Sequence, residues 1–267
     1  MKRVTSFGLF DWVFGFAGVF LLLFILIPLL TTLFSTTPGE IVASLGEKDV
    51  LHSLWVTFAA AFLATAIALV VGVPLAYLLA RREFPGKNLV QGIIDLPIII
   101  PHTAAGVALL MVFGRRGLLG EPLQSAGVYF TENMAGIVVA MLFVSLPILV
   151  DTAREAFALV DERLEKVART LGAGAWSAFR RVTLPLALRG IVAGSVLMWA
   201  RGISEFGAIV ILAYNPKAIS VLIYERFAGF GLSAALPLTA LLLIVALVIL
   251  VVTRTLLLPR RSKERRR

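Results

Sequence analysis

Long runs of apolar residues limit most strongly what this chain can fold into. The first run, 12–34, would form a helix long enough to cross a hydrocarbon core of about 30 Å, at about 1.5 Å per residue. Similar runs predict five further spans, at 54–80, 96–113, 134–150, 186–213 and 237–258. Because 59% of the 267 residues are hydrophobic and 15% are charged, most of the chain must lie in lipid. We therefore expect an all-α, polytopic membrane protein with six transmembrane helices.

The first apolar run has two interpretations, a retained helix or a signal peptide. A signal peptide has an apolar region of roughly 7 to 15 residues followed by a small-residue cleavage site. This run is longer and contains Pro28, Thr31 and Thr32 near its end without such a site. We expect a retained helix, and divide the chain into an N-terminal segment, a core transmembrane domain and a basic tail, at 1–50, 51–258 and 259–267.

Prolines and glycines mark where the predicted spans bend. Gly72 and Pro74 lie inside the second span, where neighbouring helices can satisfy the freed backbone groups. Pro97 and Pro101 lie at the start of the third span and predict a kink or a broken first turn there. The more polar segments 35–53 and 114–133 are expected to be loops.

The basic residues predict the orientation of the chain. The net charge is +9, from 25 Lys and Arg against 16 Asp and Glu. Most basic residues lie at the termini and in the loops after the second and fourth spans, whereas the opposite loops hold only Lys48, Arg115, Arg116, Lys217 and Arg226. Cytoplasmic loops are enriched in Lys and Arg, so we expect both termini and the fourth loop in the cytoplasm. This distribution does not favour binding to nucleic acid.

Several kinds of chemistry are missing from the sequence. There is no cysteine, no G-x-x-x-x-G-K-[ST] phosphate-binding loop, no H-E-x-x-H and no G-x-S-x-G segment. The two histidines lie far apart in sequence. We therefore expect no catalytic residue, no metal site and no cofactor bound by this chain, and any energy for its work would come from a partner.

The charged segment 161–185 lies between two apolar runs and is the expected working surface. Its first half places apolar residues at i, i+3, i+4 and i+7, which is one stripe on a short helix: Leu164, Val167, Ala168 and Leu171. Asp161 is the expected N-cap of this helix and Gly172 its expected stop. Trp176, Phe179 and Val182 repeat the apolar spacing after the break. The pattern predicts two short helices, joined at a glycine, that protrude from the membrane.

This segment resembles the coupling loop of ABC importer permeases, which reads EAA, three residues, Gly, nine residues, Ile, one residue, Leu-Pro. Gly172 is followed by nine residues and then by Val182, Thr183, Leu184 and Pro185. The first half is looser, because 166–168 occupies the EAA positions and the nearest acid, Glu165, comes one residue early. The resemblance implies docking to a separate ATPase subunit through Leu164, Glu165, Val167, Ala168, Leu171, Gly172, Trp176, Phe179, Leu184 and Pro185. The alternative is an amphipathic loop helix lying on the lipid surface.

Further stretches are similar to the molybdate, tungstate and sulfate branch of this family. They are 84–87, 95–97, 100–103, 105–110 and 199–208. The resemblance implies a permease for molybdate or tungstate in the plasma membrane of a prokaryote. It further implies a homodimer, two ATPase subunits that bind ATP and Mg²⁺, and an extracytoplasmic binding protein that delivers the oxyanion. Sulfate is the nearest alternative cargo, followed by ferric iron or thiamine.

Ionisable residues inside the fifth span are the main candidates for the translocation path. Such residues cost about 2.5 to 3.5 kcal/mol on insertion, and usually face a protein interior or a water-filled path. Arg201 and Glu205 are four residues apart and either neutralise each other or line the path or its gate with Ser204. His102 and Thr103, at the start of the third span, are weaker candidates for the same path.

Hydroxyl groups in the spans have two possible roles. Those of Thr103, Ser145, Ser195 and Ser204 could donate hydrogen bonds to a passing oxyanion or could bond to helix backbone.

A different class of protein, an ion-driven secondary transporter, would show inverted repeats with interrupted helices in corresponding positions. No convincing internal repeat is present, and a membrane scaffold without transport would not explain Arg201 and Glu205 in a span.

Overall fold

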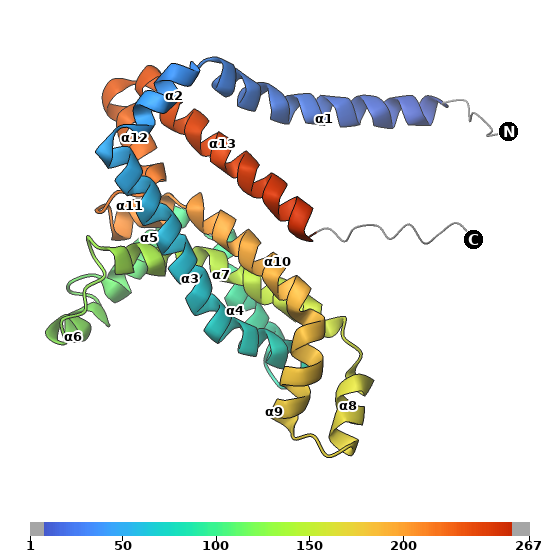
Figure 1. Ribbon diagram of the computed structural model, residues 1–267. Helices are drawn as coiled ribbons and strands as arrows, with labels where there is room; N and C mark the ends of the chain where they lie inside the picture. The colour runs from blue at the N-terminus through green and yellow to red at the C-terminus, as the bar shows by residue number, and fades with distance from the viewer. Residues whose placement is uncertain (1–7, 258–267) are drawn as a thin grey trace.

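The computed structural model describes residues 8–257, and every regular element in that range is a helix (Figure 1). The basic tail expected at 259–267 lies outside the described residues. In chain order the elements are α1 (Leu9–Phe34), α2 (Pro38–Leu45), α3 (Lys48–Arg81), α4 (Lys87–Ile99), α5 (His102–Phe113), α6 (Gly120–Ser125), α7 (Met134–Ala158), α8 (Glu162–Thr170), α9 (Ala175–Ala178), the π-helix η1 (Phe179–Thr183), α10 (Leu184–Ile203), α11 (Gly207–Leu212), α12 (Ile219–Phe230) and α13 (Leu232–Leu257).

Helices α3, α7 and α10 pack against one another and form the core of the fold. Small residues line their contacts. A Cβ on Gly190 would lie 2.4 Å from Cβ of Ala156, and a Cβ on Gly194 would lie 2.9 Å from Cβ of Thr152. Lipid tails are as apolar as leucine, so helices in a membrane associate through close packing, which small residues permit. The glycines of α10 therefore fix how closely it approaches α7.

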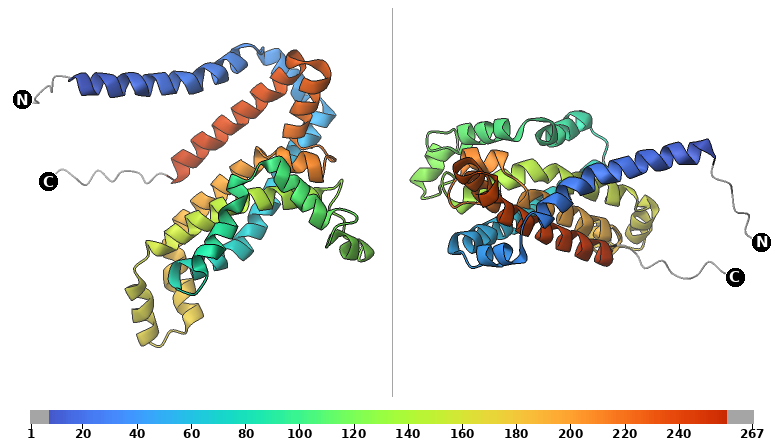
Figure 2. Two further views of the ribbon diagram at one scale, coloured as in Figure 1. Left: turned by 180° about the vertical axis from the view of Figure 1, so that it is seen from behind. Right: turned by 90° about the horizontal axis from the view of Figure 1, so that it is seen from above.

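The number of long apolar helices agrees with a multi-pass membrane protein. Five are long and apolar enough to span a membrane, and a sixth span exists if the bent pair α4 and α5 is one. The expected first, second, fourth and sixth spans are α1, α3, α7 and α13. In Figures 1 and 2, α1 extends away from the bundle, and no side chain of α1 is buried. Its surface is therefore left for lipid or another chain.

The third span breaks near Pro101, as expected, whereas the fifth differs from the expected continuous helix. The third begins earlier, at Lys87, and breaks between α4 and α5 with a bend of 114°. Ile100 precedes Pro101 and is extended, with ψ 144°, because the proline ring disfavours the helical region for the residue before it. The fifth span ends as a helix at Ile203, and α11 follows as a separate element. In the left view of Figure 2, α4 and α5 form a V in front of the bundle.

The segment 35–53 is helical and is not the expected loop. Thr37 caps α2, because its Oγ1 accepts a hydrogen bond from N of Glu40 at 3.3 Å, and Glu40 Oε2 accepts one from N of Thr37 at 2.7 Å. The hydroxyl of Thr37 also donates to Glu40 Oε2 at 2.9 Å, and the two bonds donated by Thr37 to this carboxylate lower the pKa of Glu40 below its ordinary value. The reciprocal pair is the capping box of a helix start. Helix α3 then begins at Lys48.

The first helix of the protruding segment 161–185 has the expected ends. Asp161 Oδ1 accepts a hydrogen bond from N of Arg163 at 2.9 Å and caps α8. Gly172 has φ +91°, a left-handed conformation that favours glycine, and ends that helical region. Helix α9 and η1 then run directly into α10. In Figure 1, α8 and α9 lie at one end of the α3–α7–α10 bundle, and α2 and α12 lie at the other end of α3.

Candidate functional site

The protruding segment presents an apolar face that nothing in the described part of the chain covers. Leu164, Val167, Leu171 and Trp176 are exposed, with Leu171 at 84% and Trp176 at 72%. Ala168 is half-buried on the same helix, and Gly172 is exposed at the turn. Exposed apolar patches of this kind mark contacts with proteins or membranes. The structure thus groups most of the residues expected at the docking face.

Three of the expected docking residues point inward. Phe179 packs on Tyr77 of α3 with ring centroids 4.8 Å apart, although it also stacks on exposed Trp176 at 5.5 Å. Leu184 packs against the same inner cluster as Phe179, whereas Pro185 is exposed. The third is Glu165, whose side chain is 17% exposed and faces α3. Helical spacing predicted the exposed stripe, but it could not show which side chains meet α3.

The ionisable residues of the fifth span form a cluster at the break between α10 and α11. Arg201 Nη2 donates a hydrogen bond to Glu205 Oε2 at 3.1 Å, and His102 Nδ1 of α5 lies 3.0 Å from the same oxygen. Glu205 Oε1 accepts a hydrogen bond from N of Ala208 at 2.9 Å. Glu205 is fully buried, while Arg201 keeps partial exposure. One carboxylate therefore bonds α10 to α11 and contacts α5.

The remaining residues expected on the path lie at the edge of this cluster. Ser204 is exposed, accepts a hydrogen bond from Arg201 Nη1 at 3.3 Å and donates one to O of Arg201 at 2.9 Å. Thr103 is exposed on α5, beside His102. Arg201 and Glu205 thus pair with each other, and Ser204 places an exposed hydroxyl beside Arg201.

Close helix contact holds the cluster together. A Cβ on Gly207 would lie 2.8 Å from Cβ of His102, and a Cβ on Gly106 would lie 3.0 Å from Cα of Ala208. Real Cβ atoms do not approach so closely, so these glycines allow α5 and α11 to touch. The contact brings His102 to Glu205.

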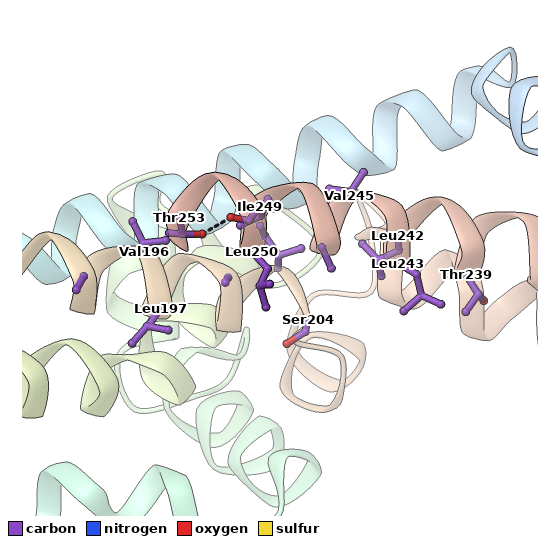
Figure 3. Close-up of a pocket in the computed structure, with 14 residues that line it drawn as sticks. Val196, Leu197, Ser204, Thr239, Leu242, Leu243, Val245, Ile249, Leu250 and Thr253 are labelled. Atoms are coloured by element: carbon purple, nitrogen blue, oxygen red, sulfur yellow. Dashed lines mark hydrogen bonds between the residues drawn. The ribbon is translucent and has the colours of Figure 1, made fainter. Parts of the chain in front are cut away.

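A groove of about 760 Å³ separates α10 from α13 beside this cluster (Figure 3). Its lining is almost wholly apolar and includes Val196, Leu197, Leu242 and Ile249. Ser204 lies at its edge and supplies one of its few polar groups. A groove of this composition suits lipid tails or an apolar helix and does not suit an oxyanion, which needs hydrogen-bond donors or positive charge.

Buried polar atoms without hydrogen-bond partners mark a second group of polar residues, on α4 and α7. Asp95 of α4 lies beside Asp151 of α7, and Arg154 Nε is 3.6 Å from Asp151 Oδ1. Asp95 Oδ1, Arg154 Nε and Ser145 Oγ are buried without a hydrogen-bond partner among the described residues. Ser195, by contrast, donates to O of Ile191 in its own helix at 2.8 Å. The acids could have been suspected as charges in or near spans, but only the packing of α4 on α7 brings them together.

The sequence of this chain is similar to those of known membrane transport proteins. Residues 72–261 match the family described as binding-protein-dependent transport system inner membrane component. The molybdate/tungstate transport system permease protein WtpB of Thermococcus kodakarensis is 41% identical, over 86% of this chain and 89% of that protein. The molybdenum transport system permease protein ModB of Escherichia coli is 43% identical, over 57% of this chain and 67% of that protein.

A solved structure shows the same fold. A chain from a bacterial alginate ABC transporter, in complex with its alginate-bound periplasmic protein, superposes with a TM-score of 0.72. The superposition covers 92% of this chain and 94% of that chain at 18% identity, which supports the fold alone. With the family match over most of its length, the chain belongs to the binding-protein-dependent transport system inner membrane components.

Proposed function

We propose that this chain is the permease subunit of an ATP-driven importer and forms the translocation path for molybdate or tungstate. Relatives at about 41% identity over most of the chain bear the name of molybdate/tungstate permeases. The chain itself carries no phosphate-binding loop, so its work requires an ATPase on another chain.

The main support for this proposal is the exposed apolar face of the protruding segment 161–185, which extends beyond the helix bundle. Leu171 and Trp176 lie at the tip of the segment that resembles the coupling loop. Contact through shape and apolar surface transmits motion better than exposed ion pairs, which are individually weak. The segment would act as a lever, by which closure of the ATPases on ATP rocks the helix bundle between inward-open and outward-open states.

The proposal includes partners and a location. Two copies of this chain would assemble with two ATPase subunits, which bind ATP and Mg²⁺, and with an extracytoplasmic binding protein. The assembly would lie in the plasma membrane of a prokaryote, with both termini and the segment 161–185 in the cytoplasm. The excess of Lys and Arg in these parts of the sequence supports this orientation.

The cluster around Glu205 is the proposed gate of the path. Arg201 and Ser204 offer donors on the exposed side of the cluster, whereas Glu205 and His102 join the ends of α10, α11 and α5. A movement of α5 against α11 would have to break these contacts. The cluster can therefore hold one state of the path until the lever moves the bundle.

Uptake by the reconstituted assembly tests the proposal. Liposomes containing this chain, its ATPase and its binding protein should accumulate labelled molybdate or tungstate only with ATP, and should take up labelled sulfate poorly. Preferred uptake of sulfate would establish the alternative cargo. Uptake driven by an ion gradient without the ATPase would establish a secondary transporter and overturn the proposal.

A further inference from the structure

Glu165 joins the protruding segment to two transmembrane helices. Its Oε1 accepts a hydrogen bond from the Tyr77 hydroxyl of α3 at 2.7 Å. Its Oε2 accepts one from the Thr183 hydroxyl at 3.1 Å, and Thr183 is fully buried where η1 meets α10. Arg81 Nε of α3 lies 3.9 Å from the same Oε2. One carboxylate thus links α8 to the inner ends of α3 and α10.

Arg81 strengthens the link through a second route. Its side chain is 7% exposed, and its Nη2 donates a hydrogen bond to O of Val160 at 2.8 Å, just before α8. Its Nη1 lies 4.0 Å from Glu162 Oε1. The guanidinium therefore holds the chain entering α8 and lies beside the carboxylate of Glu165. Hydrogen bonds to an ionised acceptor are roughly twice as strong as those between neutral groups.

An aromatic cluster supports the same junction. The ring of Tyr77 lies 5.4 Å from that of Phe157 and 4.8 Å from that of Phe179, both near edge-on. Tyr77 is thereby fixed with its hydroxyl toward α8. The acceptor, its donors and their packing all lie within this chain, and each carboxylate oxygen of Glu165 accepts a hydrogen bond from it.

We propose that Glu165 is a positioning residue that fastens the coupling segment to α3 and α10, so that force on the segment moves these helices. The inference rests on the proposed function and changes the role of one residue within it. Glu165 works inside the permease, and the exposed apolar face alone meets the ATPase. Without this link, α8 would pivot at Gly172 and at the turn before Asp161, and the ATPase would hydrolyse ATP without moving the helices.

The test compares Glu165→Gln with the wild type in the complete reconstituted assembly. The glutamine keeps the shape but loses the charge and one strong acceptor. We expect the ATPase to remain bound, ATP hydrolysis to continue, and the amount of molybdate transported per ATP to fall on the order of tenfold, as loss of a charged hydrogen bond suggests. Thr183→Val and Tyr77→Phe remove one donor each. Each should also lower the amount of molybdate transported per ATP, but by less than Glu165→Gln.

Glu162→Gln is the matched control. Glu162 lies on the same helix and also faces Arg81, but it is 54% exposed and has no bond to α10. Its replacement should leave transport per ATP within twofold of the wild type. An equal loss in both variants would assign the effect to charge near Arg81 and would overturn the link to α10.

A distance measurement separates fastening from general damage. The chain has no cysteine, so spin labels can be placed at Arg169→Cys on α8 and Leu78→Cys on α3, diluted with unlabelled chain. The wild type should give one narrow distance in both nucleotide-free and ATP-bound states, and Glu165→Gln a broad one. If Glu165→Gln instead keeps the narrow distance and loses the ATPase, the residue is an ATPase contact and the inference is wrong. Absence of ATP-driven transport in the wild type would instead refute the proposed function itself.

Discussion

At the scale of single residues, the buried carboxylate of Glu205 has three partners to lose. It contacts Arg201, His102 and the backbone of Ala208 while fully buried. An ion pair taken out of water gains little net stability, but removal of one partner leaves the other charge uncompensated. The cluster is therefore sensitive to substitution even though it need not stabilise the fold.

Replacement of Glu205 tests this sensitivity. Glu205→Ala should lower the free energy of unfolding by about 2 to 4 kcal/mol, somewhat less than for a fully buried pair because Arg201 keeps partial exposure. Ser204→Ala, one residue away and exposed, is the control and should cost under about 0.5 kcal/mol. Unfolding midpoints in detergent measure both. Equal midpoints for the two variants would contradict the described pairing.

The contact between α5 and α11 depends on the missing side chain of Gly207. Gly207→Val would place Cβ 2.8 Å from Cβ of His102, so the two helices must separate. We expect a loss of about 1 to 3 kcal/mol from overpacking, together with reduced transport. Gly229→Ala in α12, where nothing lies within 4 Å, should be neutral or stabilising. Thermal unfolding of both variants checks the expectation, and an undisturbed Gly207→Val protein would contradict this contact.

At the scale of elements, the local sequence predicted the ends of α8. It did not predict features that depend on contacts between residues far apart in the chain. Asp161 and Gly172 act through their immediate neighbours, so sequence spacing was sufficient. The capping box of α2 is also local, because Thr37 and Glu40 are three residues apart, but the polar composition of the segment around them favours a loop. The break after Ile203 and the inward turn of Glu165 depend on contacts with α5 and α3, which no local pattern contains.

The turn at Gly172 tests the element that joins α8 to α9. Gly172→Pro forces φ to about −65°, whereas the native value is +91°. The docking face would lose its shape, so we expect ATPase binding and oxyanion uptake to fall together. Gly174→Ala is the control, because its φ is −65° and no atom lies within 4 Å of the added Cβ. Normal ATPase binding and uptake by Gly172→Pro would show that this segment is not the docking element.

The capping box of α2 makes a prediction about pH. Two hydrogen bonds from Thr37 lower the pKa of Glu40, so the folded state favours the ionised form. Their contribution is full above the ordinary pKa of 4.5 and is lost as pH falls through the lower folded value. Hydrogen exchange of the first turn of α2 should therefore speed up on acidification, and Glu40→Gln should remove the pH dependence. A pH-independent wild type would contradict the capping bonds.

At the scale of the whole molecule, hydropathy predicted an all-helical, multi-pass protein but not how its spans are divided. Length and composition identify α1, α3, α7 and α13 directly. Pro97 and Pro101 predict a kink or a broken first turn between α4 and α5 but not the bend of 114°, because a proline indicates a break without fixing its angle. The pairing of Asp95 with Asp151 depends on that bent pair lying against α7.

The lever interpretation requires the tip of the protruding segment to lie in the cytoplasm and to be covered by the ATPase. The absence of cysteine in the chain allows a single probe, Trp176→Cys, to report both. A membrane-impermeant maleimide should label this residue in inside-out vesicles and not in right-side-out vesicles, and addition of the ATPase subunit should protect it. Labelling from the outer surface, or inside labelling that the ATPase leaves unchanged, would contradict the account.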